Sequence, residues 1–296
     1  MPIKELTSSP GMKTLYPKAA LGSIEAPLRR LPVLGSLVGG GGDGNLPDTE
    51  LVLPEVEIER EHLTEYQRVC GYPFSDELPA TYAHVVAFPL AMQIMTDRSF
   101  PFPVIGMVHI ENRIEHIRPL RRQDWLTMRV RAEDLADHDK GTQFDIVAEA
   151  SVGEEPVWRS RSTYLHREGG SEDGGKKKDH SDEPPEHDAV WDVPGDIGRK
   201  FAAISGDRNP IHMHPVAARL FGMPGAIAHG MWLKARCLAA LGERLPDAYT
   251  VEVSFKAPLK IPARVDFASW PEEGGLGFAV HDEASGRPHL LGRTKP

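Results

Sequence analysis

Three polar residues in the last third of the chain stand close enough together to carry out acid–base chemistry. Asp207 supplies a carboxylate, Asn209 a carboxamide and His212 an imidazole, all within six residues. A carboxylate and an imidazole aimed at one point can exchange a proton with a substrate or a water molecule. The competing interpretation is a structural turn, because Asp and Asn in a Gly-Asp-x-Asn-Pro segment also bond to their own main chain.

The residues around this triplet predict a tight, irregular loop between two helices. Gly206 ends an apolar helical pattern and is a typical helix stop. Pro210 disfavours helical backbone angles at Asn209. A loop held at both ends by helices could aim the three side chains at one point. The helices expected on either side span residues 196–204 and 216–221.

A second informative segment, Ala228-His229-Gly230-Met231, opens an apolar helix that we expect to run to Leu245. The N–H of Gly230 would have no partner inside this helix and would lie at the positive end of its dipole. Such a donor can face a developing oxyanion, and the missing side chain would let a substrate approach the backbone. We expect His229 to orient the helix start and Met231 to line the core or an acyl pocket.

The pattern Phe201-x-x-Ile-Ser-Gly-Asp-x-Asn-Pro-Ile-His212, followed by Ala228-His-Gly-Met231, resembles the MaoC-like, R-specific enoyl-thioester hydratase and dehydratase family. The resemblance covers the C-terminal third directly and implies a hot-dog fold. The paired layout with a long N-terminal arm resembles in particular the actinobacterial acyl-dehydratases of fatty-acid metabolism.

The resemblance implies reversible addition of water to the C2=C3 bond of a trans-2-enoyl thioester, giving a (3R)-3-hydroxyacyl thioester. It implies that Asp207 and His212 act as the acid–base pair and that the Gly230 amide stabilises the thioester oxygen. Asn209 could orient the water or the Asp207 carboxylate. No separate cofactor is expected, because coenzyme A or phosphopantetheine would be part of the substrate, and an acyl carrier protein is a candidate partner.

Further residues are expected to contact the substrate: Lys256, Met231, Pro210 and His229. Lys256 and Lys260 flank one Pro-Leu turn and Arg118, Arg121 and Arg122 flank another, where they could hold coenzyme A phosphates or simply be solvated. We expect no metal site, because neither a Cys nor a carboxylate completes a ligand set with the histidines at 212, 214 and 229.

Two halves of the chain repeat the same order of a helix followed by strands, which indicates duplication of one unit. Ala83-His84-Val85 corresponds to Ala228-His229-Gly230, and Ile114–Leu120 corresponds to Val253–Leu259. The expected fold is therefore α+β, a tandem or double hot-dog in which each antiparallel sheet wraps a central helix. The expected segments are an N-terminal arm at 1–48, a degenerate hot-dog at 49–167, a disordered linker at 168–188 and a catalytic hot-dog at 189–296.

The first repeat has lost the polar triplet. Aligning Gly71 with Gly206 places Tyr72, Phe74 and Glu77 opposite Asp207, Asn209 and His212, and places Val85 opposite Gly230. We therefore expect one site per chain, in the C-terminal half, with the N-terminal half forming a wall of the acyl pocket. The arm at 1–48 is given no function.

The bulk composition limits the classes of protein. The net charge of −9 argues against nucleic acid as the main partner. Cys70 and Cys237 are too far apart in the sequence to suggest a disulfide framework, and no apolar run is long enough to span a bilayer. We expect a cytoplasmic protein, in which two units in one chain could complete a hot-dog pair or assemble further into a homodimer.

Two alternatives to the dehydratase are a hot-dog thioesterase and a non-catalytic subunit that binds acyl thioesters. A thioesterase needs a carboxylate placed to act at C1, and the Asp-x-Asn-Pro-x-His arrangement is not the usual pattern of that class. A binding subunit would be favoured by a degenerate triplet, whereas the triplet at 207–212 is intact.

Overall fold

The computed structural model describes residues 1–16, 44–104, 107–167, 186–220, 223 and 225–296. Most of the expected linker and the middle of the N-terminal arm lie outside these residues. In the described part, no helix is both long and apolar enough to cross a membrane.

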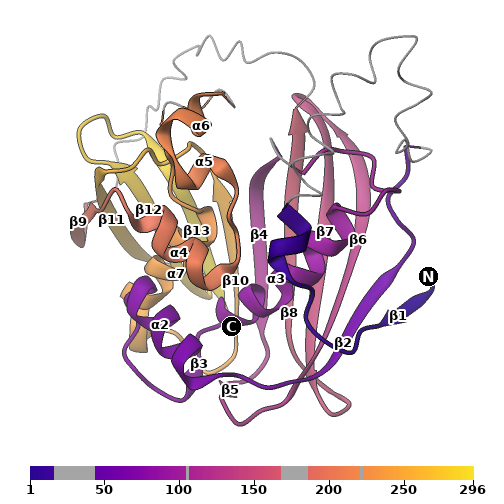
Figure 1. Cartoon of the computed structure of the whole chain (residues 1–296). Helices are drawn as coiled ribbons and strands as arrows, with labels where there is room; N and C mark the ends of the chain where they lie inside the picture. The colour runs from indigo at the N-terminus through magenta and orange to yellow at the C-terminus, as the bar shows by residue number, and fades with distance from the viewer. Residues whose placement is uncertain (17–43, 105–106, 168–185, 221–222, 224) are drawn as a thin grey trace, which may run out of the picture.

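One large sheet is the main structural element of the molecule (Figure 1). Its eleven described strands run in the order β1-β2-β6-β7-β8-β4-β10-β13-β12-β11-β9, and all neighbours are antiparallel except β1 and β2. The strands are β1 (Ile3–Glu5), β2 (Glu50–Val56), β4 (Val108–His116), β6 (Leu126–His138), β7 (Gly141–Val152), β8 (Glu155–Arg167), β9 (Ala189–Val193), β10 (Tyr249–Phe255), β11 (Ala263–Glu272), β12 (Gly275–Asp282) and β13 (Pro288–Lys295).

The strand order shows the duplication that the sequence predicts. From the outer edge inward, the first half runs β2-β6-β7-β8-β4 and the second runs β9-β11-β12-β13-β10, so strands in equivalent places are equivalent in the chain. The halves join where β4 pairs with β10, with Ile114 opposite Val251. The expected tandem hot-dog is confirmed, and both units belong to one continuous sheet.

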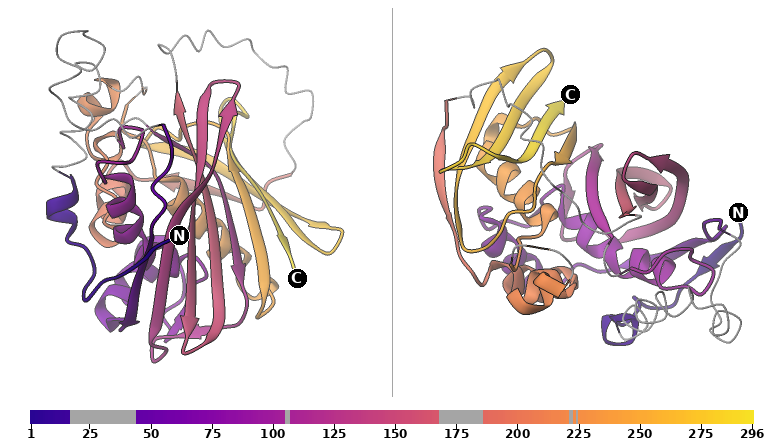
Figure 2. Two further views of the ribbon diagram at one scale, coloured as in Figure 1. Left: turned by 90° about the vertical axis from the view of Figure 1, so that its right-hand side faces the viewer. Right: turned by 90° about the horizontal axis from the view of Figure 1, so that it is seen from above.

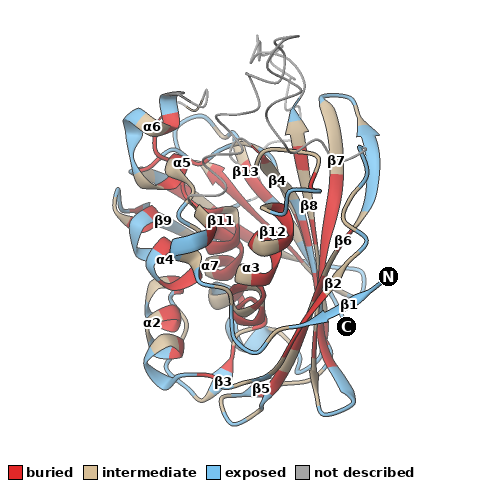
Figure 3. Cartoon of the chain, turned by 45° about the vertical axis from the view of Figure 1, so that its right-hand side comes forward, coloured by how far each residue is buried: buried red, intermediate tan, exposed pale blue. Residues whose placement is uncertain are grey.

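Each half wraps its sheet around one central helix, α3 (Tyr82–Met95) or α7 (Gly230–Leu241) (Figure 2). Both helices are buried on most sides, which is why their sequences are apolar nearly throughout (Figure 3). The expected helix to Leu245 ends earlier, at Leu241, and is followed by a 3-10 turn, η1 (Gly242–Arg244).

Shorter helices pack against the central helices: α2 (Arg60–Cys70) contacts α7, and α4 (Ile197–Ser205) contacts α3. Helix α2 ends at Gly71 and α4 ends at Gly206, and both glycines adopt the left-handed conformation, with φ of 81° and 76°. The remaining elements are α5 (Pro210–Met213), α6 (Pro215–Leu220) and the paired two-residue strands β3 (Glu77–Leu78) and β5 (Leu120–Arg121).

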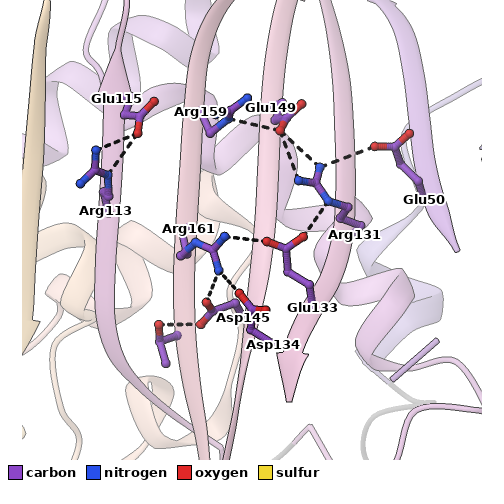
Figure 4. A network of polar contacts seen from close by, with 11 residues as sticks. Glu50, Arg113, Glu115, Arg131, Glu133, Asp134, Asp145, Glu149, Arg159 and Arg161 are labelled. Carbon is purple, nitrogen blue, oxygen red and sulfur yellow. Dashed lines mark hydrogen bonds and ion pairs between the residues drawn. The ribbon is translucent and has the colours of Figure 1, made fainter. Parts of the chain in front are cut away.

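The sheet is apolar toward the helices and polar toward solvent. Along β6, buried residues alternate with partly exposed ones from Leu126 to Ala132. On the outer face, Arg131 pairs with Glu133 and Glu149, and Arg161 reaches across to Glu133 (Figure 4). These ion pairs, one within β6 and two between strands, lie on the outer face, opposite the apolar face that encloses the helices.

Candidate active site

Asp207 lies two residues after the end of α4. The left-handed Gly206 turns the chain away from the helix, and the N–H of Asp207 donates to Ser205 Oγ at 3.1 Å. The carboxylate Oδ1 accepts the N–H of Asn209 at 3.1 Å and the hydroxyl of Tyr16 at 3.1 Å. One carboxylate oxygen is therefore held by two donors, while the side chain keeps 28% of its surface exposed.

His212 lies in a helix, so the prediction of an irregular loop across the whole triplet is wrong. Pro210 occupies the first turn of α5, where its missing N–H costs nothing, and the side chain of Asn209 caps that helix by accepting the N–H of Ile211 at 3.4 Å. Only residues 206–209 between the two helices are irregular. The short helix turns the imidazole back toward Asp207.

The hydrogen bonds of His212 fix its tautomer. Its Nδ1 lies 2.9 Å from the carbonyl oxygen of Ile227, which can only accept, so Nδ1 carries the proton. The other nitrogen, Nε2, lies 4.0 Å from Asp207 Oδ2. Burial lowers the pKa of His212 despite the nearby Asp207 carboxylate, so the imidazole is neutral and Nε2 is an available base.

His229 supports the carboxylate from the other side. It precedes α7, and its Nε2–H donates to the main-chain oxygen of Asp207 at 2.9 Å while lying 3.7 Å from Oδ2. Its ring stacks on His212 with centroids 3.7 Å apart. Burial, reinforced by His212, lowers the pKa of His229 to about 3. A neutral His229 therefore ties the start of α7 to the Asp207 loop through this hydrogen bond.

The charge of Asp207 results from opposing effects. Burial alone would raise its pKa, but His229, His212, the N–H of Asn209 and the hydroxyl of Tyr16 together bring that pKa below its usual value. At neutral pH the site therefore holds one carboxylate facing a neutral imidazole. Asn209 contributes to this state through its main chain rather than through its carboxamide.

Gly230 is the first residue of α7 and lines the same cavity as Asp207 and His212. A Cβ built on Gly230 would come within 2.8 to 3.0 Å of ring atoms of Phe255. A larger residue at this position would therefore collide with the Phe255 ring. This is a second reason for glycine, beside the expected approach of the substrate to the backbone.

A cavity of about 820 Å³ connects the polar residues with both halves of the chain. Asp207 and His212 lie in its wall, and Phe88, Met92 and Met95 of α3 line it from the N-terminal half. A volume of this size is typical of small-molecule sites. The N-terminal half, which lacks the polar triplet, contributes this apolar wall instead.

The residues expected to bind substrate are only partly brought together. Lys256, Met231 and His229 line the cavity, whereas Pro210 is not among its described lining residues. Arg118, Arg121 and Arg122 are also not among them. Arg118 instead pairs with Asp124 and Glu155, and Arg122 with Asp76. Of the two interpretations left open for these arginines, the ion pairs favour surface residues over a place beside Lys256 at the cavity.

Several lining residues went unrecognised from the sequence. Tyr16 comes from the N-terminal arm, and three further cations line the cavity with Lys256: Lys140, Arg167 and Arg287. The cations sit in ordinary strand ends and hairpins, which give no signal of function. Tyr16 is brought to Asp207 from 191 residues away in the sequence, which no local pattern predicts.

Asp207, His212 and His229 are near enough to one another to raise the question of a metal ion, since their ligand atoms lie within 4.8 Å. His214 is not part of this group, in which Asp207 stands beside His212 and His229 instead. However, the Nε2–H of His229 is engaged by the Asp207 carbonyl, and an ion at that nitrogen would break the bond. The arrangement suits proton transfer better than metal binding.

A partly buried carboxylate opposite a neutral imidazole, in the second unit of a tandem hot-dog, is the arrangement expected of a MaoC-like dehydratase. The MaoC like domain matches residues 178–290. Over 252 residues the chain is 35% identical to 3-hydroxyacyl-thioester dehydratase X of Mycobacterium tuberculosis, covering 84% of this chain and 90% of that protein. The chain belongs to the MaoC-like dehydratase family, as its motif predicted.

Structural comparison gives the same family. The crystal structure of HtdX of Mycobacterium tuberculosis matches with a TM-score of 0.75 and 34% identity, covering 83% of this chain and 99% of that one. A segment of 65 residues is 34% identical to (R)-specific enoyl-CoA hydratase of Aeromonas caviae, covering 22% of this chain and 48% of that enzyme.

Proposed function

We propose that this chain catalyses the reversible hydration of trans-2-enoyl thioesters to (3R)-3-hydroxyacyl thioesters. The observation that carries the proposal is the 4.0 Å separation of Asp207 Oδ2 and His212 Nε2 in the wall of the cavity. A water molecule to one side of the line joining these atoms could lie about 2.8 Å from each and bond to both. The names of the related dehydratases and hydratase support the thioester substrate.

In the hydration direction, the Asp207–His212 pair takes one proton from the water while its oxygen bonds to C3. The C2=C3 electrons move toward the thioester carbonyl, whose oxygen becomes negative. The N–H of Gly230, at the positive end of α7, is the proposed donor to this oxygen. The pair then returns its proton to C2, so that the site ends unchanged. Dehydration follows the same steps in reverse.

The two halves are proposed to supply different parts of the site. The C-terminal unit at 189–296 supplies the acid–base groups, and the N-terminal unit at 49–167 supplies the apolar wall through α3. Lys256, with the other cations on the cavity wall, is suited to the phosphates of coenzyme A or of phosphopantetheine on an acyl carrier protein. No cofactor beyond the carrier is required by this chemistry.

The proposal is tested by following the conjugated-thioester absorbance of crotonyl-CoA and longer trans-2-enoyl-CoA esters. The wild-type protein should consume it and form the (3R) product. His212→Ala and Asp207→Asn should lose about two to four orders of magnitude in rate, the usual contribution of general acid–base groups. Asp192→Asn, a highly exposed carboxylate outside the cavity lining, is the control and should be unchanged.

Three results would contradict the proposal. Release of free thiol from the ester, without loss of the double bond, would indicate a thioesterase. Binding of enoyl-CoA and enoyl carrier-protein esters without turnover of either would indicate a binding subunit. Undiminished hydration by Asp207→Asn would remove Asp207 from the acid–base pair.

A further inference from the structure

The N-terminal arm reaches the candidate active site, although its sequence gave no reason to expect it. Residues 12–16 are helical and lie in the indigo segment of Figure 1. Leu15 is buried, with 4% of its surface exposed, and belongs to the main apolar core. Met12 packs against the turn at Gly206: a Cβ added to Gly206 would lie 3.2 Å from the Met12 side chain. The arm is therefore anchored by apolar contacts directly against the turn that precedes Asp207.

Tyr16 ends this anchored segment and bonds to the turn in two directions. Its hydroxyl donates to Asp207 Oδ1 at 3.1 Å and accepts the main-chain N–H of Arg208. The hydroxyl thus sits between the carboxylate and the backbone of the next residue. A side chain that only covered the site would not need both contacts.

These contacts determine which carboxylate oxygen is available. Oδ1 receives the Tyr16 hydroxyl and the Asn209 N–H, whereas Oδ2 lies toward His212 and His229. Two donors on one oxygen fix the plane of the carboxylate, because rotation would exchange the oxygens and break both bonds. We propose that Tyr16 is a positioning residue that holds Asp207 with Oδ2 turned toward His212.

The tyrosine is chemically suited to this task. Burial, together with the adjacent Asp207 carboxylate, raises the pKa of Tyr16 above its usual value, so the hydroxyl stays protonated. It therefore remains a donor whenever Asp207 is ionised. A donor to the ionised carboxylate also favours that charge state.

This inference rests on the proposed hydratase function, and its test separates the two. Tyr16→Phe keeps the ring and removes only the hydroxyl. We expect kcat for crotonyl-CoA hydration to fall by about tenfold or more, as for loss of a hydrogen bond to a charged group. KM should stay close to wild type, and the unfolding temperature should fall only slightly, because the folded state loses the same hydrogen bond. Thr14→Ala is the matched control on the same arm, because Thr14 is exposed and its hydroxyl donates to the main-chain oxygen of Gly11, three residues away.

A second measurement does not depend on turnover. In protein labelled with carboxyl-¹³C aspartate, the Asp207 signal is assigned by its loss in Asp207→Asn. Removing the Tyr16 donor should move the Asp207 titration to higher pH, because the ionised form loses a hydrogen bond. Thr14→Ala should leave the titration unchanged.

The outcomes are distinct. A wild-type protein that does not hydrate enoyl thioesters contradicts the proposed function, and the carboxyl titration still decides the role of Tyr16. An active wild type with Tyr16→Phe inside about twofold of its kcat contradicts the positioning role. An unchanged Asp207 titration in Tyr16→Phe contradicts it as well, whatever the rates.

Discussion

Protonation at the candidate site is controlled by burial at the imidazoles and by hydrogen bonds at the carboxylate. Burial keeps His212 and His229 neutral, while Asp207 is ionised among four favourable partners. Water activation needs a free base, and in this arrangement both Asp207 Oδ2 and His212 Nε2 are unprotonated. Protonation of either base at low pH therefore removes the active state of the site.

This leads to a prediction about pH. The pKa of His212 lies below the ordinary 6.5, so kcat/KM for hydration should be constant from about pH 7 upward and fall only below 6.5. Stability should follow the same sign. Each of the three groups has a folded pKa below its unfolded value, so its contribution is complete above the unfolded pKa and is lost as pH falls.

The checks are a kcat/KM profile and thermal unfolding between pH 5 and 8. The unfolding temperature should fall toward pH 5, because the imidazoles are neutral in the folded protein and take up protons when it unfolds. An acid limb centred above pH 7 would mean that His212 is charged in the resting site, and it would contradict the assigned tautomer. His212→Ala should lose part of the acid destabilisation.

The residues of the site could be predicted from the sequence only where they share a local motif. Asp207 and His212 were found because six consecutive residues carry them, and Gly230 because it opens an apolar helix. Tyr16 was missed because its contact joins distant parts of the chain. The expectation that Pro210 keeps Asn209 out of helical backbone angles is confirmed, with ψ of 127°, whereas the start of α5 at Pro210 was not predicted.

Among the elements, those with a clear local signal in the sequence were predicted best. Nearly continuous apolar sequence predicted the central helices α3 and α7, and Gly206 predicted the end of α4. The short edge strand β9 was missed because only five residues mark it and their burial is incomplete. Its strand identity depends on pairing with β11, which is a tertiary effect.

Helix α7 contains a feature that hydrophobic patterning would not predict, the fully buried Lys234. Its Nζ lies 2.6 Å from Asn112 Oδ1, 3.3 Å from Asn112 O and 3.2 Å from Val251 O. Burial lowers the pKa of Lys234 well below its usual value, but three acceptors require three N–H donors, which favours the ammonium form. The lysine ties α7 to β4 and β10, where the two units join.

We predict that Lys234→Met destabilises the fold. The methionine would fill most of the volume but leave the Asn112 side chain without its donor, at a cost of about 1–3 kcal/mol for a buried unsatisfied group. Urea unfolding measures the change. Lys200→Met, on the exposed side of α4, is the control and should lie within about 0.5 kcal/mol of wild type. Equal stability of Lys234→Met and wild type would show that the three contacts contribute little.

At the scale of the whole molecule, duplication explains why one chain has two units and one candidate site. The β4–β10 pairing makes a single sheet, so the helices α3 and α7 face a common cavity from neighbouring units. With the polar triplet absent from the first unit, that unit is free to bury apolar surface. This arrangement predicts that α3 limits the length of the acyl chain.

Met92 of α3 is the position to test, because it lines the cavity and is almost completely buried. A four-carbon acyl group ends one carbon beyond C3 and needs little of the cavity, whereas a twelve-carbon group must extend along its apolar wall. Met92→Trp should therefore lower kcat/KM for trans-2-dodecenoyl-CoA by about tenfold or more, the discrimination that a few blocked methylenes provide, while crotonyl-CoA hydration changes little.

The control must separate blocking of the cavity from damage to the core. Met128→Trp introduces the same bulk at a buried position of the N-terminal sheet that does not line the cavity. It should lower stability and affect both substrates equally. If Met92→Trp also reduces crotonyl- and dodecenoyl-CoA hydration by the same factor, the acyl chain does not run along α3, and the N-terminal unit supports the fold rather than the substrate.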